Sequence, residues 1–182
     1  MVTAAVLAAA TSGCNDDDDN DKVYNAYAKW QEYNNTWLAE QQARKNPDGT
    51  PYFQTVVAPW DPNAFVLMHY FNDRSLTAGN LSPMYTSTID TRYHLSLADG
   101  TPVDSSYLLT ANGPAIFRTS LDEVITGWAI AYETMHVGDT VECIIPYQQA
   151  YGTTSTGGIP PYSHLKYNMS LVDIYTYEVN PK

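Results

Sequence analysis

The residues best suited to form a functional site lie between positions 123 and 172, where aromatic and aliphatic side chains alternate with short turn motifs. Trp128, Tyr151 and Ile159 are expected to surround a small apolar pocket. The polar groups near it are few: the phenol of Tyr151, the carboxylate of Asp104 and the backbone. Such a pocket can hold and desolvate a prolyl ring, but it offers no nucleophile, metal ligand set or phosphate cradle.

Other kinds of catalytic site find no support in the sequence. The four histidines show no short ligand spacing, so a metal site is not expected. Asp122 and Glu123 are adjacent and would diverge in most backbones, which does not suit the carboxylate pair of a glycosidase. No G-x-S-x-G motif is present, and Gly157-Gly158 lacks the helix and lysine of a phosphate-binding loop. No metal or cofactor is therefore predicted.

The composition bounds the class of protein. The chain has 182 residues, enough for one domain plus an extension, with 13% aromatic and only 16% charged residues. Low charge with many aromatic residues argues for an ordered, β-rich protein. The net charge of −11, with nine lysines and arginines in total, argues against a nucleic acid partner, because phosphate binding needs clustered positive charge.

Residues 1–14 are predicted to be a signal segment. The apolar run from Val2 to Ala10 is too short to span a bilayer as a helix, and small residues then precede Cys14. This pattern resembles a bacterial lipoprotein signal, which implies cleavage before Cys14, acylation of its thiol and attachment to a membrane. The alternative is an N-terminal tag or a frayed tail in which Cys14 is incidental.

Residues 15–21 are predicted to form an acidic, solvated tether, because a charged run with few apolar residues cannot pack. The run also resembles the surface-export signals of Bacteroidetes lipoproteins. The resemblance implies a protein of the bacterial cell envelope, anchored by lipid to the outer membrane and facing the periplasm or the cell surface.

The second cysteine, Cys143, is predicted to have a packing role. With Cys14 acylated it has no partner for an intrachain disulfide. It alternates with Val141 and Ile145 in a strand pattern, which favours a place in the core. A reactive thiol is the alternative.

An N-terminal helical extension is predicted over residues 22–48, with the helix itself running from Asp21 to Gln42. Its residues recur at spacings of three and four, which indicates an amphipathic helix: Val23, Tyr27, Trp30, Tyr33 or Asn34, and Trp37, with Leu38 widening the stripe. Such a stripe usually docks on the body of its own domain. A helix that binds a partner protein is the alternative.

Residues 49–182 are predicted to form an antiparallel α+β domain. Strands are expected over residues 53–57, 65–71, 87–97 and 164–175. A short helix interrupts them. Ser120-Leu121-Asp122-Glu123 has the form of a capping box, but β-branched residues and Gly127 follow it, so we place the helix between about Thr126 and Gly138.

Six short motifs occur in the order and near the spacing of the FKBP-type peptidyl-prolyl isomerases: Asp99-Gly100 with Val103-Asp104-Ser105-Ser106, Glu123-Val124-Ile125 with Gly127-Trp128, Met135 with Val137-Gly138, Ile145-Pro146, Ala150-Tyr151-Gly152, and Ile159-Pro160-Pro161. The resemblance covers roughly residues 83–176. It implies a curved antiparallel sheet wrapped around one short helix, with an extra N-terminal helix in this chain. It also implies isomerisation of X-Pro bonds in client proteins.

The resemblance also implies roles for particular residues. Trp128 is similar to the indole that forms the pocket floor, and the Ile125 backbone N–H and the Tyr151 phenol resemble donors to substrate carbonyls. Asp104 matches the carboxylate beside the pocket, although a turn hydrogen bond or ion pair is an equally good role for it. The remaining implied substrate-binding residues are Tyr93, Val103, Phe117, Val124, Ile159 and Tyr167.

Two positions depart from the family pattern. Val103 stands where the family usually has Phe, and Ala115 stands where it usually has an aromatic residue. Both changes reduce apolar surface at the expected rim, so a wider or shallower pocket is predicted. The resemblance also implies macrolide inhibitors of the family as ligands of this pocket. The alternative function is therefore a binding module or chaperone that captures proline-containing segments with little turnover.

Overall fold

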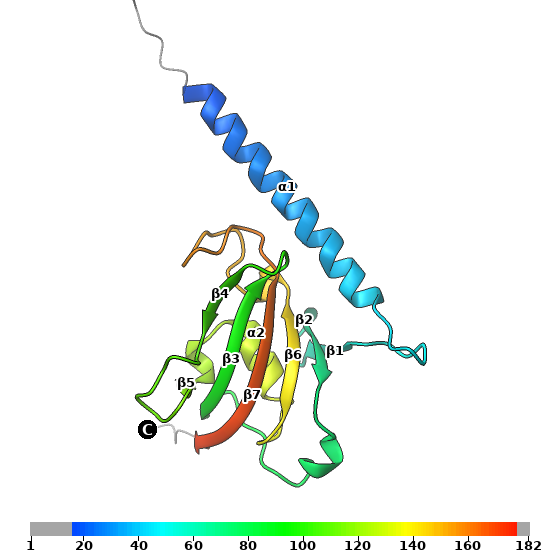
Figure 1. Cartoon of the computed structure of the whole chain (residues 1–182), viewed down its shortest axis with the longest axis vertical. Coiled ribbons are helices and arrows are strands. Elements are labelled where there is room, and N and C mark those ends of the chain that lie inside the picture. Colours follow the sequence, from blue (N-terminus) through cyan, green and yellow to red (C-terminus); the bar gives the residue numbers. More distant parts are fainter. Residues whose placement is uncertain (1–15, 178–182) are drawn as a thin grey trace, which may run out of the picture.

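A seven-stranded antiparallel sheet forms the body of the protein, in the order β1-β2-β6-β7-β3-β4, with β5 also paired to β3 (Figure 1). The computed structural model describes residues 16–177, with side chains from Val23 onward. The strands are β1 (Gln54–Ala58), β2 (Asp61–Tyr70), β3 (Thr88–Leu97), β4 (Pro102–Ser105), β5 (Phe117–Ser120), β6 (Thr140–Ile145) and β7 (Leu165–Thr176). The predicted α+β class is confirmed.

A short helix, α2 (Thr126–Tyr132), packs against one face of this sheet, and the main core lies between them. Six of its residues, from Gly127 to Tyr132, are buried. They contact inward-facing side chains of the long central strands, among them Tyr93 of β3 and Tyr167 of β7. The helix begins at Thr126, as predicted, but ends at Tyr132, well before Gly138. The capping-box residues form a separate 3₁₀ turn instead, η2 (Leu121–Glu123).

Gly127 allows α2 to lie unusually close to the sheet. A β-carbon at this position would overlap Cγ2 of Ile145 on β6. Glycine is a poor helix former, so helix propensity does not explain its presence here, whereas the close contact with Ile145 does. The next residue is Trp128, so the same close contact sets the depth at which the indole enters the core.

The N-terminal helix, α1 (Asp16–Ala43), begins five residues before the predicted start at Asp21. Residues 16–20, predicted as part of a tether, therefore have helical backbone. A run of aspartates suits the first turns of a helix because the partial positive charge of that end stabilises acidic groups. With 28 residues the helix is about 42 Å long. Figure 1 shows its N-terminal half projecting beyond the sheet.

The C-terminal half of α1 docks on the domain, as predicted for the aromatic stripe. The Trp30 indole N–H donates to Ser163 Oγ at 2.9 Å, and the His164 backbone N–H donates to Oδ1 of the fully buried Asn34 at 2.8 Å. Trp37 and Leu38 pack against a small cluster on the outer face of the sheet, made of Phe53, Leu67 and Ile144. The earlier part of the stripe, Val23 and Tyr27, is exposed.

His164 lies beneath this helix contact. Its side chain is almost fully buried, and Nδ1 accepts a hydrogen bond from the Tyr147 backbone N–H at 2.9 Å. Its Nε2 atom is buried without a hydrogen-bond partner among the described residues. Burial disfavours the charged imidazolium and lowers the pKa of His164 from 6.5 to about 4.

Only one of the two cysteines lies among the described residues. Cys14 lies outside them. Cys143 is buried in β6, where burial raises the pKa of its thiol, and this supports the predicted packing role over a reactive thiol. Within residues 16–177, none of the helices is both long and apolar enough to cross a membrane.

We predict that Gly127→Ala destabilises the protein by about 1–3 kcal/mol, because the added methyl group forces α2 away from Ile145. Chemical denaturation followed by circular dichroism measures the change. The matched control is Ala129→Gly in the same helix, which removes a methyl group instead. The double variant Gly127→Ala with Ile145→Val should recover part of the loss, and an unchanged free energy of unfolding in Gly127→Ala would contradict the argument.

We predict that the free energy of unfolding decreases as the pH falls from about 6.5 to 4. In this window the unfolded state binds a proton at His164, whereas the folded state, with its pKa near 4, keeps the ring neutral. Between pH 6.5 and 5 this linkage contributes about 1–2 kcal/mol. Urea denaturation of the wild type and His164→Gln at several pH values measures it, and the variant should show a shallower dependence. Equal slopes would show that His164 is not the group responsible.

Candidate functional site

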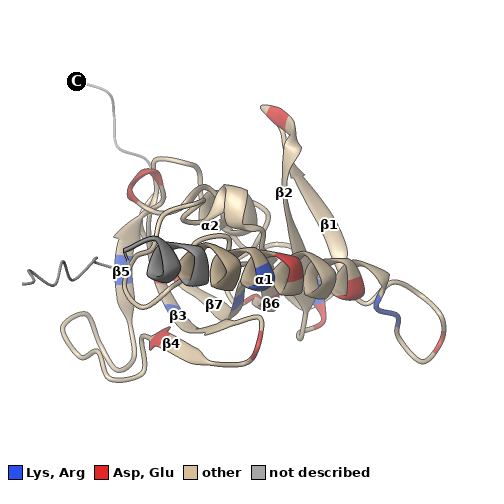
Figure 2. Cartoon of the chain, turned by 90° about the horizontal axis from the view of Figure 1, so that it is seen from above, with Lys and Arg blue, Asp and Glu red and all other residues tan. Residues whose placement is uncertain are grey.

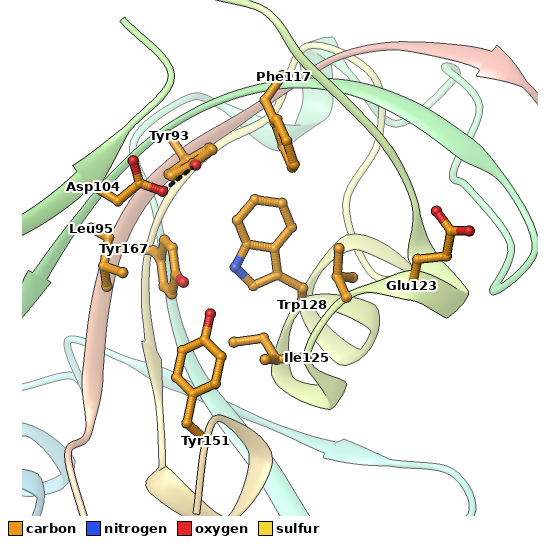
Figure 3. A pocket seen from close by; sticks show the side chains of 10 residues that line it. Tyr93, Leu95, Asp104, Phe117, Glu123, Ile125, Trp128, Tyr151 and Tyr167 are labelled. Carbon is orange, nitrogen blue, oxygen red and sulfur yellow. Dashed lines mark hydrogen bonds between the residues drawn. The ribbon is translucent and has the colours of Figure 1, made fainter. Parts of the chain in front are cut away.

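A cavity of about 290 Å³ opens between the start of α2 and the inner face of the sheet (Figure 3). This volume is at the lower end of the range for ligand sites, so it suits one small ring better than a drug-sized molecule. Its lining is mostly aromatic and aliphatic. The lining residues are Tyr93, Leu95, Asp104, Phe117, Glu123, Val124, Ile125, Trp128, Tyr151 and Tyr167.

The indole of Trp128 forms the floor of the cavity. Its side chain is only 4% exposed, yet one face remains open to the cavity. Four aromatic rings meet it edge to face at centroid distances between 5.2 and 6.1 Å: Tyr93, Phe117, Tyr132 and Tyr167. Edge-to-face contacts are the favoured geometry for aromatic pairs. The floor is therefore fixed in position before any ligand arrives.

Strand pairing brings the aromatic walls together. Tyr93 and Leu95 are two residues apart on β3, so their side chains point to the same face. The antiparallel register places Tyr167 of β7 directly opposite Leu95. Phe117 begins β5, which pairs with the other half of β3. The walls thus come from three strands that are distant in sequence.

Asp104 is held by two hydrogen bonds. The Tyr93 hydroxyl donates to Oδ2 at 2.6 Å, and the Ser105 backbone N–H donates to Oδ1 at 2.7 Å (Figure 3). Burial, followed by the hydrogen bond to Asp104, raises the pKa of Tyr93. The carboxylate therefore fixes the Tyr93 ring as a wall. It makes the predicted turn hydrogen bond and also lies beside the cavity.

Two hydrogen-bond donors at the cavity have no partner among the described residues. One is the Tyr151 hydroxyl, on a side chain that is 39% exposed, and the other is the backbone N–H of Ile125, which immediately precedes α2. Burial, and then the negative charge of Asp104, raise the pKa of Tyr151, so its phenol stays protonated and able to donate. The cavity thus combines an apolar floor with donors at its edge.

The polar atom at the edge of the Trp128 floor also lacks a well-formed hydrogen bond among the described residues. The indole Nε1 of Trp128 is buried and makes no well-formed hydrogen bond within the part of the chain that the structure describes, although the Tyr167 hydroxyl lies close enough to interact with it. An unpaired buried donor costs free energy, and a ligand acceptor that reached it would recover this cost. This donor points in the direction of Tyr167 and Tyr151 (Figure 3).

Eight of the ten cavity-lining residues were predicted from the sequence. The two missed are Leu95 and Glu123. Leu95 could have been found from its alternation with Tyr93, whereas Glu123 was interpreted only as part of a capping box.

Two of the predicted substrate-binding residues, Val103 and Ile159, do not line the cavity. Val103 precedes Asp104 on β4, and because successive strand residues face opposite ways, Asp104 takes the cavity side. Val103 borders a separate shallow depression. Ile159 is buried in the core, 4% exposed.

Ala115 also does not line the cavity. Its backbone has a φ of +62°, an uncommon conformation for a residue with a side chain, and it lies in the turn that precedes β5. Neither Val103 nor Ala115 forms a wall of the cavity, and a wider rim at these two positions stays a prediction.

Comparison with known proteins gives a consistent picture. A sequence model of the family described as FKBP-type peptidyl-prolyl cis-trans isomerase matches residues 79–172, just over half of the chain. The macrophage infectivity potentiator of Trypanosoma cruzi is 40% identical over 98 residues, which cover 53% of this chain and 48% of that protein. The outer membrane protein MIP of Legionella longbeachae is 34% identical over 115 residues, covering 62% and 48%.

The fold is shared with solved structures. A peptidyl-prolyl cis-trans isomerase from Pseudomonas syringae superimposes with a TM-score of 0.61 and 24% identity, covering 82% of this chain and 94% of that one. The chain spans about half the length of the curated relatives it matches. From the matched motifs, the extent of the family match and the shared fold, the chain belongs to the FKBP-type peptidyl-prolyl cis-trans isomerase family.

Proposed function

We propose that the protein catalyses cis-trans isomerisation of X-Pro peptide bonds in proteins outside the cytoplasm. The observation that carries the proposal is the cavity itself. A rigid, buried indole lies at its floor, aromatic walls surround it, and the Tyr151 hydroxyl and Ile125 N–H stand unpaired at its edge. Its volume suits a prolyl ring.

The reaction needs shape and a dry environment rather than a covalent intermediate. Rotation about the peptide bond has a barrier of about 18–20 kcal/mol because amide resonance is lost in the twisted state. The twisted amide is less polar than the planar one, so withdrawal of water by the Trp128 floor and its aromatic walls favours it. Only interactions that strengthen in the twisted state accelerate the step.

The two free donors hold the substrate backbone while the amide turns. In this proposal the prolyl ring stays on the indole, and the Ile125 N–H and Tyr151 hydroxyl bond the carbonyl groups on either side of it. Asp104 acts by positioning the Tyr93 wall and by keeping the Tyr151 phenol protonated. Macrolide inhibitors of the family, expected at the same cavity, remain a prediction.

The site of action is proposed to be the bacterial cell envelope. The small residues before Cys14 and the acidic run that follows support a lipid anchor on that thiol. The relative from Legionella longbeachae is named an outer membrane protein, which agrees with an envelope location. The clients would then be extended, proline-containing segments of exported proteins.

We predict that Tyr151→Phe lowers kcat/KM for short X-Pro peptides about five- to tenfold, because it removes one hydrogen bond to the substrate. Trp128→Leu should lower it more, by about ten- to a hundredfold, because the flat floor is lost. Exchange between cis and trans peptide, followed by NMR, measures the rates. Circular dichroism verifies that the Trp128→Leu variant folds.

The matched control is Tyr147→Phe, which removes a phenol four residues away that does not line the cavity and should leave kcat/KM unchanged. Absence of turnover in the wild type, or rates untouched by both site substitutions, would exclude the isomerase. Calorimetric binding of the same peptides would then identify the alternative, a module that captures proline segments without turnover.

We predict that the protein expressed in a bacterium that processes lipoproteins carries a diacyl or triacyl group on Cys14, with residues 1–13 removed. Mass spectrometry of the membrane fraction measures this. Cys14→Ser should move the protein out of that fraction, whereas Cys143→Ser should not. An uncleaved and unmodified N-terminus would rule out the anchor.

A further inference from the structure

A second hollow, the hairpin groove, lies beside the cavity. It has a volume of about 490 Å³ and an apolar character, and Trp60, Tyr85, Val124, Thr126, Ala129 and Glu133 line it. Its two aromatic residues are open to solvent: Trp60 is 56% exposed and Tyr85 is 50% exposed. Two large exposed aromatic side chains that face a common hollow indicate a binding surface more strongly than scattered apolar residues do.

The hairpin groove is continuous with the cavity. Val124 lines both, with Glu123 and Ile125 on either side of it at the cavity. Past Tyr85 the surface leads to a further depression that shares Tyr85 and Glu133. A chain that left the cavity beside the Ile125 N–H would therefore pass over Val124 into the groove.

Firm local structure holds both aromatic residues. Trp60 occupies the turn between β1 and β2, and this hairpin stands on the same side of the sheet as α2 (Figure 2). The hairpin is anchored by Ala58 and Ala64, which are buried in the core. Tyr85 lies in a turn closed by two hydrogen bonds between Met84 and Ser87, of 2.8 and 2.9 Å. The groove is thus a built surface rather than a mobile one.

The charges around the groove have one sign. Glu133 lines it and Glu123 stands at its junction with the cavity, and no lysine or arginine lines either hollow among the described residues. Burial raises the pKa of Glu133, with a backbone hydrogen bond from Tyr85 acting in the opposite direction. A basic side chain placed here would offset the cost of burying this carboxylate and could also stack on Trp60.

We propose that the hairpin groove is an extended subsite that selects client segments carrying a bulky apolar side chain and a basic side chain within a few residues of the proline. The inference rests on the proposed isomerase function, since it takes the cavity as the place of the prolyl ring. The apolar side chain lies between Trp60 and Tyr85, and the basic one lies against Glu133. The occupant is an extended polypeptide because Val124 joins the two sites at the surface.

The test compares three seven-residue peptides with a central proline. One has alanine at all other positions; in the others, phenylalanine and lysine stand two and three residues before or after the proline. Calorimetry gives Kd, and NMR exchange gives kcat/KM. One of the two placements should bind about tenfold more tightly than the alanine peptide, as expected for a partly buried aromatic side chain.

Variants then locate the gain. Trp60→Ser and Tyr85→Ser should reduce the ratio of Kd between the alanine peptide and the tighter-binding phenylalanine–lysine peptide to within about twofold. The matched control is Phe71→Ser, which also removes an exposed aromatic residue. Phe71 directly follows the opposite end of β2, about 36 Å from Trp60 along the extended chain. This variant should keep the full ratio. Replacing the lysine of the peptide by glutamate should reduce the gain, because Glu133 repels a second carboxylate.

The outcomes separate the two proposals. Equal affinity of all three peptides, or a gain that survives Trp60→Ser and Tyr85→Ser, overturns the subsite. A change of sedimentation coefficient in these two variants, absent from Phe71→Ser, would assign the groove to a contact with a second copy and also overturn it. If no peptide is turned over but the affinities follow the expected pattern, the isomerase proposal fails and the subsite stands.

Discussion

The contact between Gly127 of α2 and Ile145 of β6 is the constraint on which the site depends. Because no side chain separates helix and sheet at this point, Trp128 reaches the inner face of β3 and β7. There it packs edge to face with Tyr93 and Tyr167 of these strands, with Phe117 of β5 and with Tyr132 of α2. The indole is then fixed with one face open. A floor that is already ordered loses little conformational entropy when a ligand binds, so the interactions made in the cavity remain available to stabilise the twisted amide.

Much of the fold follows from sequence patterns because several segments have a strong local signal. The alternation over residues 87–97 and 164–175 predicted β3 and β7 to within one residue, and the spacing of Trp30 and Trp37 predicted that α1 docks on its own domain. The short strands β4 and β5 were missed because four residues hold too little alternation to stand out. Their pairing depends on β3, which lies elsewhere in the sequence.

The site was predicted through its motifs rather than its geometry, and the errors show the difference. A motif indicates that Asp104 and Tyr151 belong together, but it does not say which neighbours turn toward the cavity. Val103 shares a motif with Asp104 and faces away from it, whereas Leu95 belongs to no motif and lines the wall. The hairpin groove has no sequence signal, because Trp60 and Tyr85 meet only after β1 and β2 fold beside α2.

The two hollows differ in the property that separates catalysis from selection. The cavity is lined by mutually packed aromatic rings, and its hydrogen-bond donors are the Ile125 backbone N–H and the Tyr151 phenol. Such a surface suits rotation about a peptide bond. The groove presents exposed aromatic rings and a carboxylate, which recognise a side chain whatever the isomeric state of the proline. Binding in the groove would therefore raise the affinity of both isomers equally. Uniform binding of this kind lowers KM without raising kcat, so it favours chosen clients at low concentration while the chemistry of the cavity stays the same.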